Sequence, residues 1–291
     1  AITFFALGTN ALGNWALVFG HLGMPALGLH GSAISSVITS TLILLAYVVV
    51  IQSDRRLRRY RLFGNWWRSE WSRFFEMLRI GMPISLTILA EAGLFTGAAF
   101  LMGRIGEAQL AGHTIALQVA ALAFQIPFGV AQAATIRVGL AYGARDHDGI
   151  GRAGAASLAL GIGFMGFTAL LMWLFPSLVL SIYVDVDAAR NAALVGFAMQ
   201  FLVVAAAFQL FDGAQAVAAG VLRGLQDTRI PMIIAICGYW IAGYGTAIYL
   251  GFWTPLAGVG VWIGLAVGLV VVAALLLTRW RMRARLGLLP A

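Results

Sequence analysis

Residues 82–102 read MPISLTILAEAGLFTGAAFLM and residues 201–222 read FLVVAAAFQLFDGAQAVAAGVL, and each of these apolar stretches contains a single acidic residue. Each stretch is long enough to cross the hydrocarbon core of a bilayer as a helix, which takes about 20 residues. A carboxylate at that depth costs at least about 2.5–3.5 kcal/mol, so it is retained where it faces a cavity or a partner. Glu91 and Asp212 are therefore the leading candidates for function.

The composition of the whole chain extends this interpretation. Of 291 residues, 61% are hydrophobic and only 10% are charged, whereas a soluble domain carries about 25% charged residues. We therefore expect an all-α integral membrane protein with about eight transmembrane helices. Their predicted ranges are roughly 2–20, 29–51, 82–103, 112–140, 153–178, 189–222, 231–251 and 257–278.

The placement of arginine predicts the topology. The 19 basic residues are all arginines, and all except Arg104 and Arg190 fall in alternate connections or in the tail. The positive-inside rule makes that side cytoplasmic, and eight spans then place both ends of this chain there. A net charge of +8 is also compatible with nucleic-acid binding. Membrane topology explains the clustering better than a phosphate-binding face does.

Polar side chains accompany both acids at helical spacing. The residues one turn from Glu91, and those three positions from Asp212, share a helical face with the acid. Further stripes consist of asparagines in 2–20 and glutamines in 112–140. Such stripes turn toward the bundle interior because lipid cannot satisfy their hydrogen bonds. The residues predicted to line a central cleft are Asn10, Asn14, Thr87, Phe95, Gln118, Gln125, Gln209 and Gln215.

Two carboxyl groups in a cavity wall are suited to ion binding. Such a group can take up a proton, and with neighbouring oxygens it can hold a small hard cation such as Na⁺. Either event changes the charge of the cavity, which couples an ion gradient to a cationic substrate. We therefore predict that Glu91 and Asp212 bind a coupling cation, Na⁺ or H⁺, and we expect no other cofactor. The alternative, a structural hydrogen bond between helices at each acid, stays open.

The sequence lacks the motifs of common enzyme classes. It contains no HExxH, no paired Asp-rich motif, no GxSxG and no phosphate loop, so we expect no enzyme activity. Cys237 is the single cysteine, which excludes an intramolecular disulfide and a cysteine metal site. Tyr239 and Trp240 are expected to pack within the bundle, and contact with a ligand is the alternative.

Four segments of the chain carry a family resemblance. In order, they are NWALVFGHLGMPALGLHGSAISS at 14–36, AGHTIALQVAALAFQIPFGVAQAATIRVGLAYGA at 111–144, FDGAQAVAAGVLRGLQDTRIP at 211–231 and YWIAGYGTAIYL at 239–250. The chain resembles the multidrug and toxic compound extrusion (MATE) family, in its NorM-like branch. The resemblance implies a twelve-helix secondary antiporter with two six-helix lobes around a central cleft. The chain would carry helices five to twelve, lacking roughly the first four. The family's cation site uses acids in the seventh and tenth helices, and Glu91 and Asp212 stand at those positions.

The resemblance and the span pattern together divide the chain into four parts. They are the last two helices of the first lobe (1–52), a cytoplasmic linker (53–81), a six-helix second lobe (82–278) and a basic cytoplasmic tail (279–291). Within the linker, the run NWWRSEWSRFFEMLRIG at 65–81 mixes aromatic and charged residues. That spacing predicts an amphipathic helix lying at the membrane interface.

We therefore expect a secondary active antiporter of the bacterial inner membrane. It would export cationic drugs or toxic organic compounds in exchange for Na⁺ or H⁺. Its partners would be small organic cations and membrane lipid, without nucleic acid, and it would act as a monomer.

Three other functions compete with export. A lipid-linked saccharide flippase of the same superfamily would favour a cleft rich in basic residues, and the predicted spans contain almost no central arginine. A membrane-embedded lipid transferase would need clustered acids or a metal site near one interface, which the sequence does not display. A non-transporting membrane scaffold is the third alternative.

Overall fold

Residues 2–54 and 69–290 are described by a computed structural model, in which the chain forms two compact units, Ala1–Trp71 and Ser72–Ala291. The first unit is a hairpin of α1 (Ile2–Phe19) and α2 (Leu29–Ser53). The helices approach closely because Gly31 lies against the backbone of Leu17, where a Cβ atom would not fit. The connection is fixed by the Leu27 amide, which donates to the Leu17 carbonyl at 2.9 Å.

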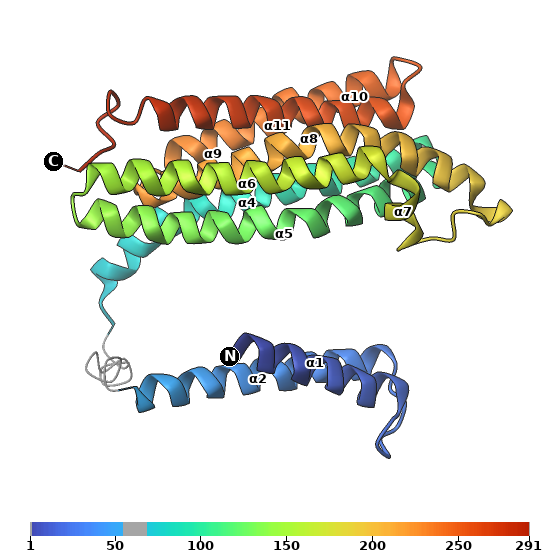
Figure 1. The fold of residues 1–291 in the computed structure, drawn as a ribbon, viewed down its shortest axis with the longest axis horizontal. Helices are drawn as coiled ribbons and strands as arrows, with labels where there is room; N and C mark the ends of the chain where they lie inside the picture. The colour runs from blue at the N-terminus through green and yellow to red at the C-terminus, as the bar shows by residue number, and fades with distance from the viewer. Residues whose placement is uncertain (1, 55–68, 291) are drawn as a thin grey trace. The chain divides into compact units, whose positions relative to one another are not determined.

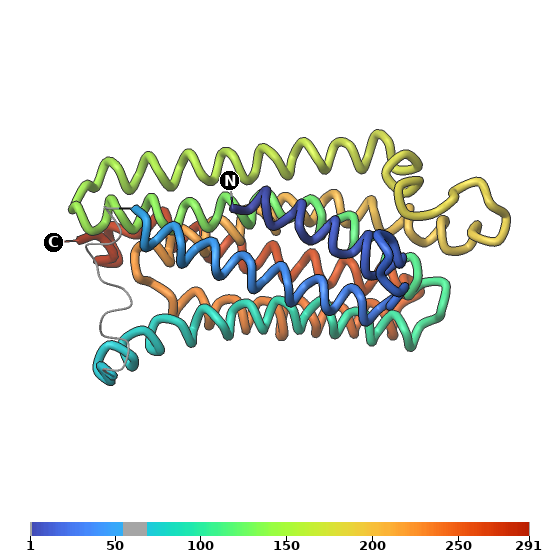
Figure 2. The backbone as a smooth tube through the Cα atoms, turned by 90° about the horizontal axis from the view of Figure 1, so that it is seen from below, coloured from blue at the N-terminus to red at the C-terminus, as the bar shows by residue number. Residues whose placement is uncertain are grey.

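The second unit is a bundle of long helices whose axes lie nearly parallel (Figure 1). In Figure 2, α4 and α6 lie on opposite sides of this unit. Its elements are α4 (Trp71–Ile105), α5 (Glu107–Gly143), α6 (His147–Leu174), α7 (Pro176–Ser181), η1 (Ala189–Asn191), α8 (Ala192–Gly224), α9 (Arg229–Ile236), η2 (Cys237–Tyr244), α10 (Gly245–Phe252) and α11 (Ala257–Arg281).

The prediction of eight membrane spans is confirmed. Eight helical segments of the described chain are long and apolar enough to cross a bilayer, and they match the predicted ranges within a few residues at most ends. The fifth span ends earlier than predicted, because α6 stops at Leu174. Pro176 disfavours helical geometry at the residue before it, and Phe175 accordingly leaves the helix at φ −133° and ψ 50°.

The predicted linker at 53–81 is only partly described. Residues 55–68, including Trp66, Trp67 and much of the arginine cluster, lie outside the described residues. From Trp71 onward the chain does not form a separate interfacial helix, since these residues are the first turns of α4. Pro83 lies inside α4 and does not end the helix. Its carbonyl accepts a hydrogen bond from the Thr87 hydroxyl at 2.9 Å. The assignment of the linker and lobes stays a prediction.

The seventh span contains a change of helix type. It begins as α9, widens into the π-helix η2, and resumes as α10. Gly238 and Gly243 lie within η2 and face Val272 and Gly268 of α11, so the wider turn still packs closely. π-Helical turns are rare overall, and those that occur are often found at functional sites. The sequence periodicity did not predict this one.

The core of the second unit centres on α8. This helix packs against α5, α6 and α11. Phe201 and Phe208 of α8 stack on Trp262 of α11, with ring centroids 5.9 and 5.4 Å from it. These large buried rings fix α8 in rotation as well as position, because each side chain fills a defined space in a close-packed interior. The rotation determines which way Asp212 points.

We expect Gly264→Ala to destabilise the second unit. A Cβ atom at Gly264 of α11 would overlap the backbone of Ala247 in α10, and forced overpacking costs about 1–3 kcal/mol. Thermal unfolding in detergent should show a midpoint lowered by several degrees. Gly163→Ala in α6 is the matched control, since a Cβ atom there meets open space. Equal midpoints for the two variants would contradict the close α10–α11 contact.

Candidate functional site

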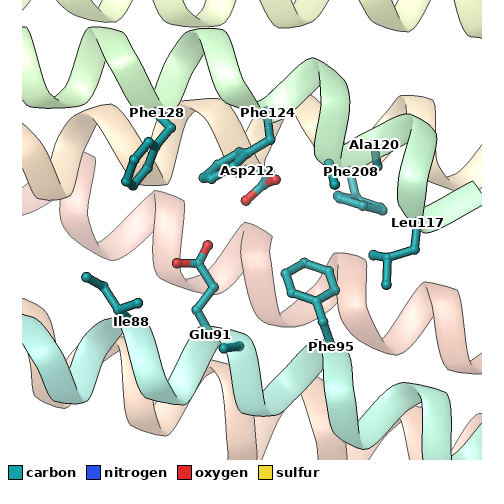
Figure 3. Close-up of a pocket in the computed structure, with 11 residues that line it drawn as sticks. Ile88, Glu91, Phe95, Leu117, Ala120, Phe124, Phe128, Phe208 and Asp212 are labelled. Carbon is teal, nitrogen blue, oxygen red and sulfur yellow. The ribbon is translucent and has the colours of Figure 1, made fainter. Parts of the chain in front are cut away.

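Helices α4, α5 and α8 line an open cavity of about 340 Å³ in the second unit. Most of its wall is apolar and aromatic, and the two predicted acids are its charged residues. Figure 3 shows the two carboxyl groups directed toward one another from α4 and α8, with phenyl rings around them. The lining residues are Ile88, Glu91, Ala92, Phe95, Leu117, Ala120, Ala121, Phe124, Phe128, Phe208 and Asp212.

A single glutamine joins the two acids. Gln215 Nε2 donates to Glu91 Oε1 at 2.8 Å and to Asp212 Oδ1 at 3.2 Å. The Tyr239 hydroxyl, from η2, donates to Gln215 Oε1 at 2.8 Å. Three spans therefore meet in one hydrogen-bonded cluster, which we call the carboxyl cluster: Glu91, Asp212, Gln215 and Tyr239.

Burial sets the carboxyl cluster apart from surface polar groups. Asp212, Gln215 and Tyr239 are 5%, 2% and 0% exposed, and Glu91 is partly buried where the cavity reaches it. Charged groups in a low-dielectric interior interact strongly with one another and with any ion that enters. A change of one charge here therefore changes the electrostatic potential within the cavity.

The predicted neighbours of the acids divide between two environments. Phe95 lines the cavity and Gln215 bonds both acids. Gln209 is fully buried on another side of α8, where its Nε2 donates to the Met165 carbonyl and the Thr168 hydroxyl of α6. A step of three residues turns a helix by about 300°, so Gln209 and Gln215 point about 60° to either side of Asp212.

Thr87 lies outside the main cavity. Its hydroxyl bonds back to the Pro83 carbonyl, and its side chain borders a much smaller hollow near Arg223 and Asp227. Thr87 precedes Glu91 by about one helical turn, whereas Phe95 follows Glu91 by about one turn, so the two residues lie on opposite sides of Glu91 along the helix axis.

The glutamine stripe of α5 occupies the face next to the cavity. Leu117 and Phe124 line the cavity, whereas Gln118 and Gln125 each follow one of them by one residue and are exposed. Consecutive residues of an α-helix are turned by about 100°, so the stripe points to one side of the cavity. Gln118 instead lines an adjoining hollow of about 380 Å³, which shares Phe95, Leu117 and Ala121 with the first.

The two predicted asparagines belong to the first unit. Asn14 Nδ2 donates to Asn10 Oδ1 at 3.0 Å, so the pair forms a local contact one turn apart on α1. Ser35 of α2 donates to the Asn10 carbonyl at 3.3 Å. The Ser35 bond joins the two helices of the hairpin, and a role for the asparagines in a cleft stays a prediction.

Tyr239 is the functional candidate that sequence reasoning missed. Its hydroxyl completes the carboxyl cluster, whereas the sequence favoured packing within the bundle over contact with a ligand. Three phenylalanines of the cavity wall besides Phe95 are a second omission: Phe124, Phe128 and Phe208. Phe124 and Phe128 have i, i+4 spacing on the helix that carries the glutamine stripe, and this spacing was a usable signal.

The donor set of the cluster limits which ions it can hold. Within residues 2–54 and 69–290, no three His, Cys, Asp or Glu side chains gather as ligands for a metal ion. Two carboxylates offer oxygen to a proton or to one small hard cation. Neither use requires a redox metal or an organic cofactor.

Comparison with known proteins agrees with this architecture. The MatE family model matches residues 83–248. A probable multidrug resistance protein NorM of Mesorhizobium japonicum is 48% identical over 286 residues, covering 98% of this chain and 61% of that protein. The NorM protein of Brucella suis biovar 1 is 46% identical over 276 residues, covering 95% and 59%. The crystal structure of the eukaryotic MATE transporter AtDTX14 superposes with a TM-score of 0.82 at 22% identity, covering 98% of this chain and 63% of that one.

These matches extend across nearly the whole chain. The chain spans about 60% of the length of the curated relatives. The names of these relatives describe multidrug resistance, in agreement with the expectation that the chain is not an enzyme. Eight candidate spans and these bacterial relatives describe a multi-pass membrane protein. The chain belongs to the MatE family, in its NorM-like branch.

Proposed function

We propose that this chain contains the ion-binding core of a secondary antiporter that exports lipophilic organic cations in exchange for Na⁺ or H⁺. The observation that carries the proposal is the placement of Glu91 and Asp212 in the wall of an otherwise apolar cavity. A carboxyl pair in that position gives the coupling ion and a cationic drug a shared electrostatic target. When the ion binds, the negative charge that attracts the drug is reduced.

The cavity wall supports an organic cation as substrate. Phenyl rings attract a cation through their faces, by about 0.5–1 kcal/mol when exposed and about 2 kcal/mol or more when desolvated. Phe95, Phe124, Phe128 and Phe208 supply such rings beside the two carboxyls. Apolar walls with a few convergent polar groups are typical of small-molecule sites.

The competing flippase is less well supported. A pyrophosphate-linked sugar carries negative charge and calls for arginine or lysine. The described lining of the cavity contains no basic residue. The paired acids oppose an anionic guest, so this lining favours export of cations.

Location and assembly follow from the same proposal. Under the positive-inside rule, the arginine-rich connections support a cytoplasmic position for both ends of this chain. We infer an inner-membrane protein that acts as a monomer, with lipid around it and the coupling cation as its one inorganic partner.

The natural protein carrying this chain should export a lipophilic cationic dye from proteoliposomes. Imposing a proton or Na⁺ gradient should drive release of the dye, and a neutral dye of similar size should be released at least about tenfold more slowly, a difference of about 1.4 kcal/mol. Collapse of the gradient by an ionophore is the control. Dye release that ignores both gradients would contradict antiport.

A further inference from the structure

A second open hollow lies between α5 and α6, near the turn that joins the two helices. It measures about 690 Å³, is lined by residues between 137 and 160, and is called the α5–α6 groove below. Figure 1 shows this turn at the same end of the second unit as the C terminus, and His147 Nε2 lies 3.0 Å from the Pro290 carbonyl oxygen. The groove and the arginine-rich tail therefore share the end that the positive-inside rule assigns to the cytoplasm.

Two arginines from neighbouring helices line the α5–α6 groove. Arg137 and Arg152 are both exposed there. Arg137 stands six residues before the end of α5 and Arg152 five residues after the start of α6, which puts them about 9 and 8 Å from the turn. Within residues 2–54 and 69–290, neither guanidinium group is in an ion pair or a hydrogen bond. Two unpaired cations therefore lie at the same level of the groove.

The other polar groups of the groove leave this positive charge in excess. Asp146 is the one acid in its described lining, and its carboxylate caps α6 by accepting from the Gly149 amide at 2.8 Å. Ser157, five residues beyond Arg152, adds a hydroxyl. The planar fork of an arginine matches the oxygens of a phosphate and binds them in pairs. The groove therefore favours an anion that carries a phosphate.

The groove continues from the arginines onto an apolar surface. Leu160 lines its deeper part, eight residues or about 12 Å farther along α6 than Arg152, and is 65% exposed. The predicted spans end at residue 140 and begin at residue 153, so the arginines lie at the edge of the hydrocarbon core and Leu160 lies within it. A free phosphate ion would contact only the polar part, whereas a phospholipid would contact both parts.

We propose that the α5–α6 groove binds an anionic phospholipid of the cytoplasmic leaflet. Arg137 and Arg152 hold its phosphate, and an acyl chain runs along Leu160. Basic pockets between transmembrane helices on the cytoplasmic side typically take anionic head groups. The groove shares no residue with the cavity that contains Glu91 and Asp212, so this inference goes beyond the proposed antiport and does not depend on it.

Lipid binding to the purified natural protein carrying this chain tests the proposal. The protein in neutral detergent is titrated with phosphatidylglycerol or phosphatidylcholine, and native mass spectrometry counts the bound lipid. Both lipids contain a phosphate, but phosphatidylcholine balances it with a cation. We expect the first phosphatidylglycerol to bind at least about tenfold more tightly, a preference of about 1.4 kcal/mol. The Arg137→Gln, Arg152→Gln double variant should lose this preference.

A second double variant controls for the loss of charge. Arg281→Gln, Arg285→Gln removes two exposed arginines from the same end of the protein but outside the groove, and it should keep the affinity for phosphatidylglycerol within about twofold. If the groove double variant does not fold, Arg137→Lys and Arg152→Lys decide the matter. Each keeps the charge and removes the planar fork, so each should lower the affinity at least about threefold.

Competition with inorganic phosphate separates the lipid from a free anion. Phosphate in about 100-fold excess should displace little phosphatidylglycerol, because it makes no apolar contact with Leu160. Displacement of most of the lipid would assign the groove to a free anion and overturn the phospholipid.

Two other results would also overturn the proposal. One is equal affinity of the wild-type protein for the two lipids. The other is an equal loss of affinity in the two double variants, which would show general attraction to a basic surface. Dye export is measured separately, so none of these outcomes bears on the proposed antiport.

Discussion

Glu91→Gln and Asp212→Asn are each expected to reduce drug efflux by at least about 100-fold, a loss of about 2.7 kcal/mol of coupling. Each variant keeps the size of the side chain and removes its ability to carry a negative charge. Both acids line the same cavity and bond the same glutamine nitrogen, so the loss of one leaves an incomplete ion site. The amount of protein in the membrane should stay the same, because a neutral amide is less costly there than a carboxylate.

Efflux of a fluorescent cationic dye from cells or proteoliposomes measures this effect. Glu107→Gln is the matched control, since Glu107 is an exposed acid in the first turn of α5 and lies outside the cavity. The control should keep wild-type efflux. Wild-type efflux in either cavity variant would show that the carboxyl pair does not couple ion and drug.

Ala121→Trp is expected to weaken drug binding at least about tenfold, or about 1.4 kcal/mol. Ala121 lines both the main cavity and the hollow beside it, so an indole at this position takes space that the drug needs. The carboxyl cluster is built from α4, α8 and η2, and a substitution on α5 leaves its hydrogen bonds in place. Ion binding should therefore persist while drug binding weakens.

Dye binding to the purified protein, followed by fluorescence polarisation, distinguishes these effects. Ala133→Trp on the same helix is the matched control, because Ala133 is exposed and lies outside both hollows. Equal dye affinity in the two tryptophan variants would place the drug site elsewhere in the protein.

Much of the fold was predictable because the bilayer imposes a simple length rule. Eight apolar segments and an alternating distribution of arginine predicted eight spans, and eight candidate spans are present. The π-helix η2 was not predictable in this way. Gly238 and Gly243 of this segment lie in close tertiary contact with α11, and the apolar pattern of residues 231–251 does not distinguish a π-helix from an α-helix.

The site was predictable at the acids and less so around them. Glu91 and Asp212 stand out because a carboxylate within an apolar span is energetically costly and is retained where it faces a cavity or a partner. Gln209 and Gln215 are equivalent in spacing from Asp212, and only the packing of α8 against α6 on one side and η2 on the other separates them. Tyr239 has an ordinary apolar context in sequence, so its hydroxyl contact emerges only when η2 is placed beside α8.

Ion release on drug binding tests the shared use of the carboxyl pair most directly. The purified natural protein carrying this chain is titrated with a lipophilic cationic dye in weakly buffered solution, while a pH electrode and a Na⁺ electrode record released ions. If the ion and the drug compete for the pair, reciprocal linkage requires about one ion to leave per dye bound, and the Glu91→Gln, Asp212→Asn double variant releases none. Dye binding without ion release in the wild-type protein, or equal release in the double variant, would contradict exchange at Glu91 and Asp212.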